Sequence, residues 1–275
     1  MHSGVNNKIV KIPDGVQVIT RNQFVENHEL EEIFLPESVW KIEEWAFLNC
    51  TNLRKIHFSY GIERIEQNAF YKCSALEELQ FPSSLFYVGS RAFFRCESLD
   101  HVDFKNIDEI EEYAFSDCLN LSSVSLPDKM KKIADGVFSG CKELKNLVFP
   151  KEIHELGSGI LRNCVSLKTV SLPDNIYNLP SYTFYNCTSL QEIQIPEMVV
   201  SIEHYAFYNC INLENVSLSK VLRLIGNSAF KNCKALKNIA LYKNVVIIMN
   251  SAFRNCVNLE QIMLPDNIDV IELYT

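Results

Sequence analysis

This sequence lacks the features that would place it in a membrane or mark it for secretion. It has no apolar run long enough to cross a bilayer. Its first ten residues, Met1 to Val10, are polar and lack the basic-then-apolar pattern of a signal peptide. These absences predict no membrane insertion. They leave three possibilities for the compartment: a cytosolic protein, export by another route, or an export signal that has already been removed.

Basic residues are also too few to suggest a polyanionic partner. The chain has 26 Lys and Arg against 34 Asp and Glu, a net charge of -8 and a pI of about 5.4. This balance argues against nucleic acid or an anionic membrane as the main partner. Apolar residues make up 47% of the sequence and mean hydropathy is -0.01, values typical of a soluble protein with a long core.

Catalytic motifs are missing as well. The sequence contains no phosphate-binding glycine loop, dinucleotide fingerprint, H-E-x-x-H or nucleophile elbow, which predicts no catalytic residue, cofactor or metal. One group of residues invites a metal or acid–base interpretation: His57, Glu78, His101 and Asp103. On parallel strands His57 and Asp103 would lie two strands and roughly 10 Å apart, too far for one coordination shell. Cross-strand charge pairing is the simpler interpretation.

What the sequence does have is ten evenly spaced cysteines. They stand at positions 50, 73, 96, 118, 141, 164, 187, 210, 233 and 256, each step being 23 residues except one of 22. Such spacing is typical of a solenoid that copies one unit many times. Equivalent cysteines in stacked copies would have parallel Cα–Cβ vectors, which suits neither disulfides nor a tetrahedral zinc site. We expect a buried, reduced thiol ladder in the core.

The repeat reads A-F-x-x-C-x-x-L-x-x-I-x-L-P-x-x-I-x-x-I followed by three linking residues, and the copy that begins at Ala46 and Phe47 is clean. Its alternating segment L-x-x-I-x-L predicts a short strand with one buried face, which the proline closes. The I-x-x-I pair predicts a second short extended stretch. The A-F-x-x-C segment predicts a tight turn that buries Phe and Cys.

The copies predict one solenoid domain over residues 1–275, with partial repeats at both ends. Counting strand positions from Val10 to Ile262 gives about 12 short strands in one parallel sheet. The frame breaks between residues 136 and 184, where glycines cluster and Pro180 leaves the usual proline position. Either a bend or neutral drift would explain this break. The one-residue deletion before Cys118 follows Phe104 and predicts a shortened turn.

The two motifs L-x-x-I-x-L-P and A-F-x-x-C together resemble the BspA-type leucine-rich repeat, and the resemblance covers residues 9 to 273. It implies an α/β repeat solenoid of the right-handed leucine-rich-repeat type, with little helix and with parallel strands lining a concave face. Proteins of this type are mostly bacterial and protist surface or secreted proteins associated with adhesion. The resemblance therefore implies a non-enzymatic interaction module that binds a protein or extracellular-matrix ligand as an adhesin.

Two other functions compete with the adhesin interpretation. An intracellular scaffold or regulatory repeat protein is favoured by ten reduced cysteines and by the missing signal peptide. An enzyme would rest only on the histidine and carboxylate group described above. Locating the protein in its own cell would separate the adhesin from the scaffold.

The resemblance also places candidate ligand-binding residues on the concave face, where the residues flanking each buried strand position point outward. In the N-terminal third these positions are charged and mixed, and they are short and neutral beyond it. They could form a recognition patch, or a solvated face that varies without selection. The candidates are Glu32, Phe34, Lys55, His57, Glu78, Gln80, His101 and Asp103.

A second candidate surface is an outer aromatic patch. Both tryptophans occupy repeat positions that are usually polar, and the position after the repeat phenylalanine carries aromatic side chains in successive copies. Exposed aromatic files can anchor a partner, but they can equally stack on one another. The residues of this patch are Trp40, Trp45, Tyr71 and Phe94.

Overall fold

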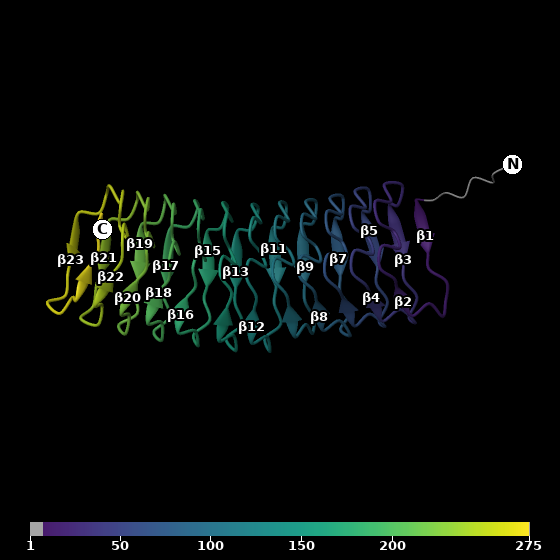
Figure 1. The fold of residues 1–275 in the computed structure, drawn as a ribbon, viewed down its shortest axis with the longest axis horizontal. Helices are drawn as coiled ribbons and strands as arrows, with labels where there is room; N and C mark the ends of the chain where they lie inside the picture. The colour runs from purple at the N-terminus through teal and green to yellow at the C-terminus, as the bar shows by residue number, and fades with distance from the viewer. Residues whose placement is uncertain (1–7, 275) are drawn as a thin grey trace. The chain divides into compact units, whose positions relative to one another are not determined.

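The computed structural model describes residues 8–274 and contains 24 short strands, with no helix among these residues (Figure 1). Strands of three and two residues alternate along the chain. The three-residue strands are β1 (Ile9–Lys11), β3 (Glu32–Phe34), β5 (Lys55–His57), β7 (Glu78–Gln80), β9 (His101–Asp103), β11 (Ser123–Ser125), β13 (Asn146–Val148), β15 (Thr169–Ser171), β17 (Glu192–Gln194), β19 (Asn215–Ser217), β21 (Asn238–Ala240) and β23 (Gln261–Met263).

The two-residue strands are the second extended stretch that the I-x-x-I pair predicts. They are β2 (Val18–Ile19), β4 (Lys41–Ile42), β6 (Arg64–Ile65), β8 (Tyr87–Val88), β10 (Glu109–Ile110), β12 (Lys132–Ile133), β14 (Glu155–Leu156), β16 (Asn178–Leu179), β18 (Ser201–Ile202), β20 (Leu224–Ile225), β22 (Ile247–Ile248) and β24 (Val270–Ile271).

The chain divides into two compact units, residues 1–127 and 128–275. In unit 1 the odd strands β1 to β11 form one six-stranded parallel sheet, and the even strands β2 to β10 form a five-stranded one. Successive strands pair in register, as Ile33 with Ile56 and Ile42 with Ile65. Each coil therefore places the same repeat position beside its counterpart, and unit 1 is a parallel β-solenoid.

Unit 2 is built from the same coils, but its sheets are interrupted once. Its odd strands form the sheets β13-β15 and β17-β19-β21-β23, and its even strands form β12-β14 and β16-β18-β20-β22-β24. The break in the even strands coincides with Pro180. At the equivalent position of other coils a backbone N–H donates to the preceding coil, as Glu203 does to Leu179 at 2.9 Å. Proline has no N–H to donate, so this rung of the ladder is missing.

The predicted number of 12 three-residue strands is confirmed, whereas a single sheet is not: these strands fall into three hydrogen-bonded sheets. The shortened turn after Phe104 is present as a bend over Lys105 and Asn106, where other coils have a two-residue turn. The frame break at Pro180 is thus a structural feature of unit 2.

The A-F-x-x-C segments form a third hydrogen-bonded wall in each unit. They are turns, and each donates backbone N–H groups to the turn of the following coil, as Phe47 does to Ala69 at 2.7 Å and Asn49 to Tyr71 at 2.7 Å. The position before the cysteine has a positive φ and is often asparagine, which tolerates the left-handed conformation better than most residues. Three walls therefore enclose one narrow core per unit.

The core contains two files of identical side chains. The repeat phenylalanines stack face to face, as Phe47 on Phe70 with ring centroids 4.8 Å apart and Phe207 on Phe230 at 5.0 Å. The ten cysteines are buried, and none forms a disulfide. Thiols donate to the carbonyl of the preceding coil's phenylalanine, as Cys73 Sγ does to Phe47 O at 3.1 Å. Burial raises the pKa of most of these thiols, that of Cys164 to about 12, whereas the hydrogen bond with the Cys73 thiol lowers the pKa of Cys50.

Candidate functional site

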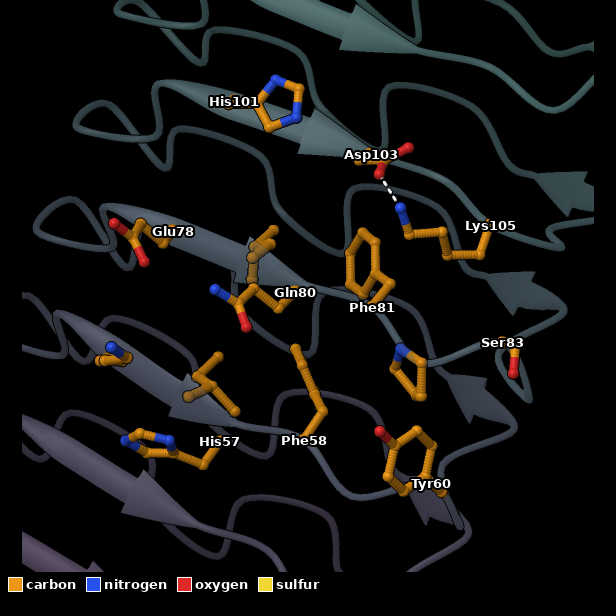
Figure 2. A pocket seen from close by; sticks show the side chains of 14 residues that line it. His57, Phe58, Tyr60, Glu78, Gln80, Phe81, Ser83, His101, Asp103 and Lys105 are labelled. Carbon is orange, nitrogen blue, oxygen red and sulfur yellow. Dashed lines mark hydrogen bonds and ion pairs between the residues drawn. The ribbon is translucent and has the colours of Figure 1, made fainter.

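The strand face of unit 1, formed by the outward side chains of its odd strands, contains a depression of about 730 Å³. Figure 2 shows its side chains, which come from the ends of β5, β7 and β9 and from the segments that follow them. The lining residues are Lys55, Ile56, His57, Phe58, Tyr60, Glu78, Leu79, Gln80, Phe81, Pro82, Ser83, His101, Asp103 and Lys105.

The depression combines an apolar floor with a polar rim. Phe58 and Phe81 lie side by side with ring centroids 5.7 Å apart, and Phe81 is only 5% exposed. Tyr60 is 79% exposed, and Figure 2 shows it beyond Phe58, with the Gln80 amide near the centre of the group. An apolar floor with a few polar groups above it is the usual composition of a binding pocket.

Charged groups of both signs surround this floor. Lys105 Nζ forms an ion pair with the Asp103 carboxylate, and this hydrogen bond lowers the pKa of Asp103 below its usual value. The register places Lys55 beside Glu78, and Glu78 beside His101. A ligand therefore meets charges of both signs along the direction in which the strands stack.

His57 is held firmly at one edge of the depression. Its Nε2 lies 2.5 Å from Glu32 Oε1, and its ring stacks on Phe34 with centroids 3.9 Å apart. Lys11 Nζ lies 5.5 Å from the centroid of the Phe34 ring. These contacts fix the orientation of the imidazole without any ligand.

The structure brings the eight candidate residues of the strand face together. Six of them line the depression, and the other two, Glu32 and Phe34, contact His57. Within residues 8–274, no three His, Cys, Asp or Glu side chains gather in a way that could hold a metal ion. The register places Glu78 beside His101, and His101 Nδ1 lies 2.8 Å from Ser123 Oγ.

Sequence reasoning missed several residues of the depression, among them Tyr60 and Lys105. Both belong to coils that lack the repeat proline, because Ser59 and Lys105 occupy the proline position. The missing prolines were therefore the available signal. They also coincide with the aromatic file Phe58, Phe81 and Phe104, where other coils mostly have aliphatic residues.

The four residues of the predicted outer aromatic patch occupy three different repeat positions. Tyr71 and Phe94 stack with centroids 5.0 Å apart, the ladder arrangement that the sequence left open. Trp45 occupies a different turn position, where the Arg21 guanidinium lies 4.3 Å from its ring centroid. Trp40 stands just before β4 and is 39% exposed.

Across the part of the chain that the structure describes, no helix is long and apolar enough to cross a membrane.

Comparison with known proteins identifies similar repeats and folds. The sequence profile described as BspA type leucine rich repeat region matches in six copies, over residues 2–122, 108–223 and 200–275. A leucine-rich repeat protein from Bacteroides ovatus is 25% identical, with 97% of this chain and 83% of that chain covered and a TM-score of 0.69. A leucine rich cell surface protein from Faecalibacterium prausnitzii is also 25% identical, covering 96% and 83%, with a TM-score of 0.65.

The pneumococcal vaccine antigen PcpA shares the fold at 23% identity, covering 94% of this chain and 72% of that chain, with a TM-score of 0.63. No curated protein sequence matches the chain.

Proposed function

This chain belongs to the BspA-type leucine-rich repeat family, a fold that generally serves as an interaction module, and from that premise we propose that it binds a protein ligand. The proposed site is the depression on the strand face of unit 1. The proposed role is that of a non-enzymatic adhesin whose ligand is a protein of another cell or of the extracellular matrix.

One observation carries the proposal. In the depression on the strand face of unit 1, the aromatic side chains of Phe58 and Phe81 form a floor between charged side chains. Protein interfaces draw most of their binding free energy from a few anchor side chains that fill desolvated pockets. Phe58 and Phe81 would contact the anchor. Lys55, Glu78 and Asp103 would set its orientation and exclude partners of the wrong charge.

A pocket-filling substitution tests this site. Gln80→Trp places a large side chain over the floor, and Gln194→Trp is its matched control because β17 (Glu-Ile-Gln) repeats the pattern of β7 (Glu-Leu-Gln). Both glutamines are exposed, so both variants should fold. Binding to a panel of purified matrix proteins is measured by biolayer interferometry. Gln80→Trp should weaken any binding at least about tenfold while Gln194→Trp leaves it unchanged.

Charge reversal tests the rim separately. The triple variant Lys55→Glu, Glu78→Lys and Asp103→Lys inverts three charges that surround the floor. We expect slower association and a changed salt dependence, because rim charges act mainly on the association rate. Unchanged binding of a confirmed ligand by both this variant and Gln80→Trp would remove the depression as the site.

The surface location is supported by the similar Faecalibacterium prausnitzii chain, which is described as a cell surface protein. The rival function, an intracellular scaffold, is favoured by ten free thiols, since such thiols persist most easily in a reducing compartment. Immunolabelling of intact and permeabilised cells separates the two. A signal seen only after permeabilisation would end the adhesin proposal.

A further inference from the structure

The turns of unit 2 form a second exposed surface, which we call the tyrosine ridge. It consists of five consecutive A-F-x-x-C turns, residues 158–163, 181–186, 204–209, 227–232 and 250–255. These turns contain Arg162, Lys231 and Arg254 and no Asp or Glu, although the whole chain has a net charge of -8. The side chains of the ridge are therefore net positive, and the carboxylates of Asp135 and Glu272 meet it only at its two end turns, where they accept hydrogen bonds from Ser158 N and Asn250 N.

Four tyrosines form the centre of the ridge. Tyr182 stacks on Tyr205 with centroids 5.0 Å apart, and Tyr185 stacks on Tyr208 at 4.8 Å. All four rings are half-buried. Because their faces cover one another, it is the ring edges and hydroxyl groups that remain available to a partner.

A cation lies over a tyrosine ring at each end of this group of four tyrosines. The Arg162 guanidinium lies 5.0 Å from the Tyr185 centroid and 5.6 Å from that of Tyr182. At the other end, Lys231 Nζ lies 5.7 Å from the Tyr208 centroid. Both cations lie over tyrosine rings, and a cation held against an aromatic ring has less side-chain freedom to lose when a ligand binds.

The backbone beneath the ridge is equally fixed. Each turn donates N–H groups to the next, as Asn186 does to Tyr208 at 2.8 Å and Tyr205 to Asn227 at 2.9 Å. A file of asparagine amides runs alongside, with Asn209 Nδ2 donating to Asn186 Oδ1 at 2.8 Å. The ridge is thus a preorganised surface whose elements repeat about every 5 Å.

From this geometry we propose that the tyrosine ridge binds an extended acidic segment of a protein partner. Carboxylates of the segment pair with Arg162, Lys231 and Arg254 and accept hydrogen bonds from the tyrosine hydroxyl groups. Tyrosine and arginine are the residues most often found at the energetic centres of protein interfaces, because they offer large rigid contact area together with polar groups. The proposal is independent of the depression in unit 1.

The charge density of the ridge favours a protein over a sulfated polysaccharide. Three cations are spread over five turns, and four partly exposed tyrosine rings lie among them. A highly charged polyanion depends on dense cationic clusters, and the acidic remainder of this chain would repel it. An acidic peptide also carries side chains that can pack against the ring edges.

The test uses a 14-residue peptide of alternating glutamate and tyrosine, its glutamine counterpart, and a heparin oligosaccharide of similar length. Affinities are measured by isothermal titration calorimetry at low and physiological salt. The ridge variant is Arg162→Glu with Lys231→Glu. The matched control is Lys72→Glu with Arg91→Glu in unit 1, which makes the same change in net charge and also removes cations that lie over tyrosine rings, those of Tyr71 and Tyr113.

We expect the acidic peptide to bind the wild-type protein and to lose at least about tenfold in affinity in the ridge variant, against less than about threefold in the control. The glutamine peptide should bind weakly to all proteins. Equal losses in the two variants, tighter binding of heparin than of the peptide, or no peptide binding at all would each overturn the proposal.

A milder variant keeps the test valid if charge reversal disturbs folding. Tyr185→Phe with Tyr208→Phe preserves the stacked rings and removes two hydroxyl groups. Peptide affinity should fall about threefold to tenfold, because two hydrogen bonds to charged acceptors are lost. Unchanged affinity in this variant, with circular dichroism like that of the wild type, would count against the assigned role of the hydroxyl groups and overturn the proposed geometry.

Discussion

The turns of the two units occupy the same place in the repeat but differ in charge. In unit 1, the five turns 21–26, 44–49, 67–72, 90–95 and 112–117 contain four Lys or Arg and four Asp or Glu. Some of these charges pair with one another, as Arg95 with Asp117 at 3.5 Å. In unit 2 the tyrosine ridge has three cations and no carboxylate. The charges on the turns of unit 1 balance in number, whereas the turns of the ridge contain cations only.

The strand faces show the opposite contrast. The outward positions of β5, β7 and β9 in unit 1 include Lys55, Glu78 and Asp103, whereas those of β13 and β15 in unit 2 are Asn, Val, Thr and Ser. The buried positions barely change between the units. Because a solenoid keeps scaffold and surface at separate repeat positions, each exposed file can acquire its own chemistry without altering the core.

The largest expected effect, common to both units, is a loss of stability at alkaline pH. Burial raises the pKa of Cys73, Cys96 and Cys118 in unit 1 and of Cys164, Cys187, Cys210, Cys233 and Cys256 in unit 2. Above about pH 9 the unfolded thiols ionise while the folded ones stay protonated, so stability falls as pH rises. Each thiol contributes up to about 1.4 kcal/mol per pH unit.

Urea denaturation between pH 8 and 11 checks this expectation, with Cys164→Ser as the informative variant. Serine does not ionise in this range and can still donate to the Phe138 carbonyl, which Cys164 Sγ contacts at 3.2 Å. The free energy of unfolding should fall less steeply with pH in this variant, by about 1.4 kcal/mol per pH unit. A slope identical to that of the wild type would contradict the buried thiol as its source.

The second-largest effect is expected for phenylalanine truncation, which should destabilise unit 1 more than unit 2. Phe93 stacks on Phe70 and Phe115 and also meets the edge of Phe81, whereas Phe207 only stacks on Phe184 and Phe230 in its file. Phe93→Ala should cost about 4 kcal/mol and Phe207→Ala about 1 kcal/mol less, since the edge contact is absent. Chemical denaturation followed by circular dichroism measures both, and equal losses would show that the extra ring adds nothing.

The missing rung in unit 2 predicts a smaller effect. Pro180→Glu introduces an N–H that can donate to the Leu156 carbonyl, as Gly157 does to Ile133 at 2.8 Å one coil earlier. We expect a stabilisation of no more than about 1 kcal/mol, because the new hydrogen bond is partly offset by the lost rigidity of proline. Amide hydrogen exchange provides the direct readout. Fast exchange of the new amide at position 180 would show that the coils stay apart there for another reason.

The smallest effect is expected for the paired charges on the turns of unit 1. Asp117→Asn removes the partner of Arg95, whose side chain is about half exposed. The cost should stay below about 0.5 kcal/mol and vanish in high salt, as for most exposed ion pairs. Thermal unfolding at low and high salt tests this. A loss above about 1 kcal/mol would mean that the turn charges of unit 1 are structural.

Much of the fold could be predicted because each core position recurs in nearly every coil. The files of Phe47, Cys50 and their counterparts, the twelve short strands and the two extended stretches per repeat all follow from the period. The thiol-to-carbonyl hydrogen bonds do not follow from the period, because they depend on how far one coil is displaced relative to the preceding coil. The break between β14 and β16 in unit 2 coincides with one N–H that Pro180 lacks.

The candidate site was only partly predictable for a related reason. Residues such as Lys55, Glu78 and Asp103 could be identified because they flank buried strand positions. Tyr60 and Lys105 could not, since they belong to the segments that follow the strands and do not flank a buried strand position. The tyrosine ridge was visible as files of tyrosine, but its cation-closed ends depend on side-chain conformation.

The hydrogen bonds from the thiols to the preceding coils have a consequence for changes in the number of coils. Donor and acceptor are 26 residues apart in most coils, but Cys118 reaches Phe93 over 25 residues at the same 3.2 Å. The lost residue was absorbed in the bend after Phe104, so the linking segment tolerates small changes of length. Duplication or loss of a whole coil would leave every remaining thiol with an acceptor, which makes the coil the natural unit of gene-length variation.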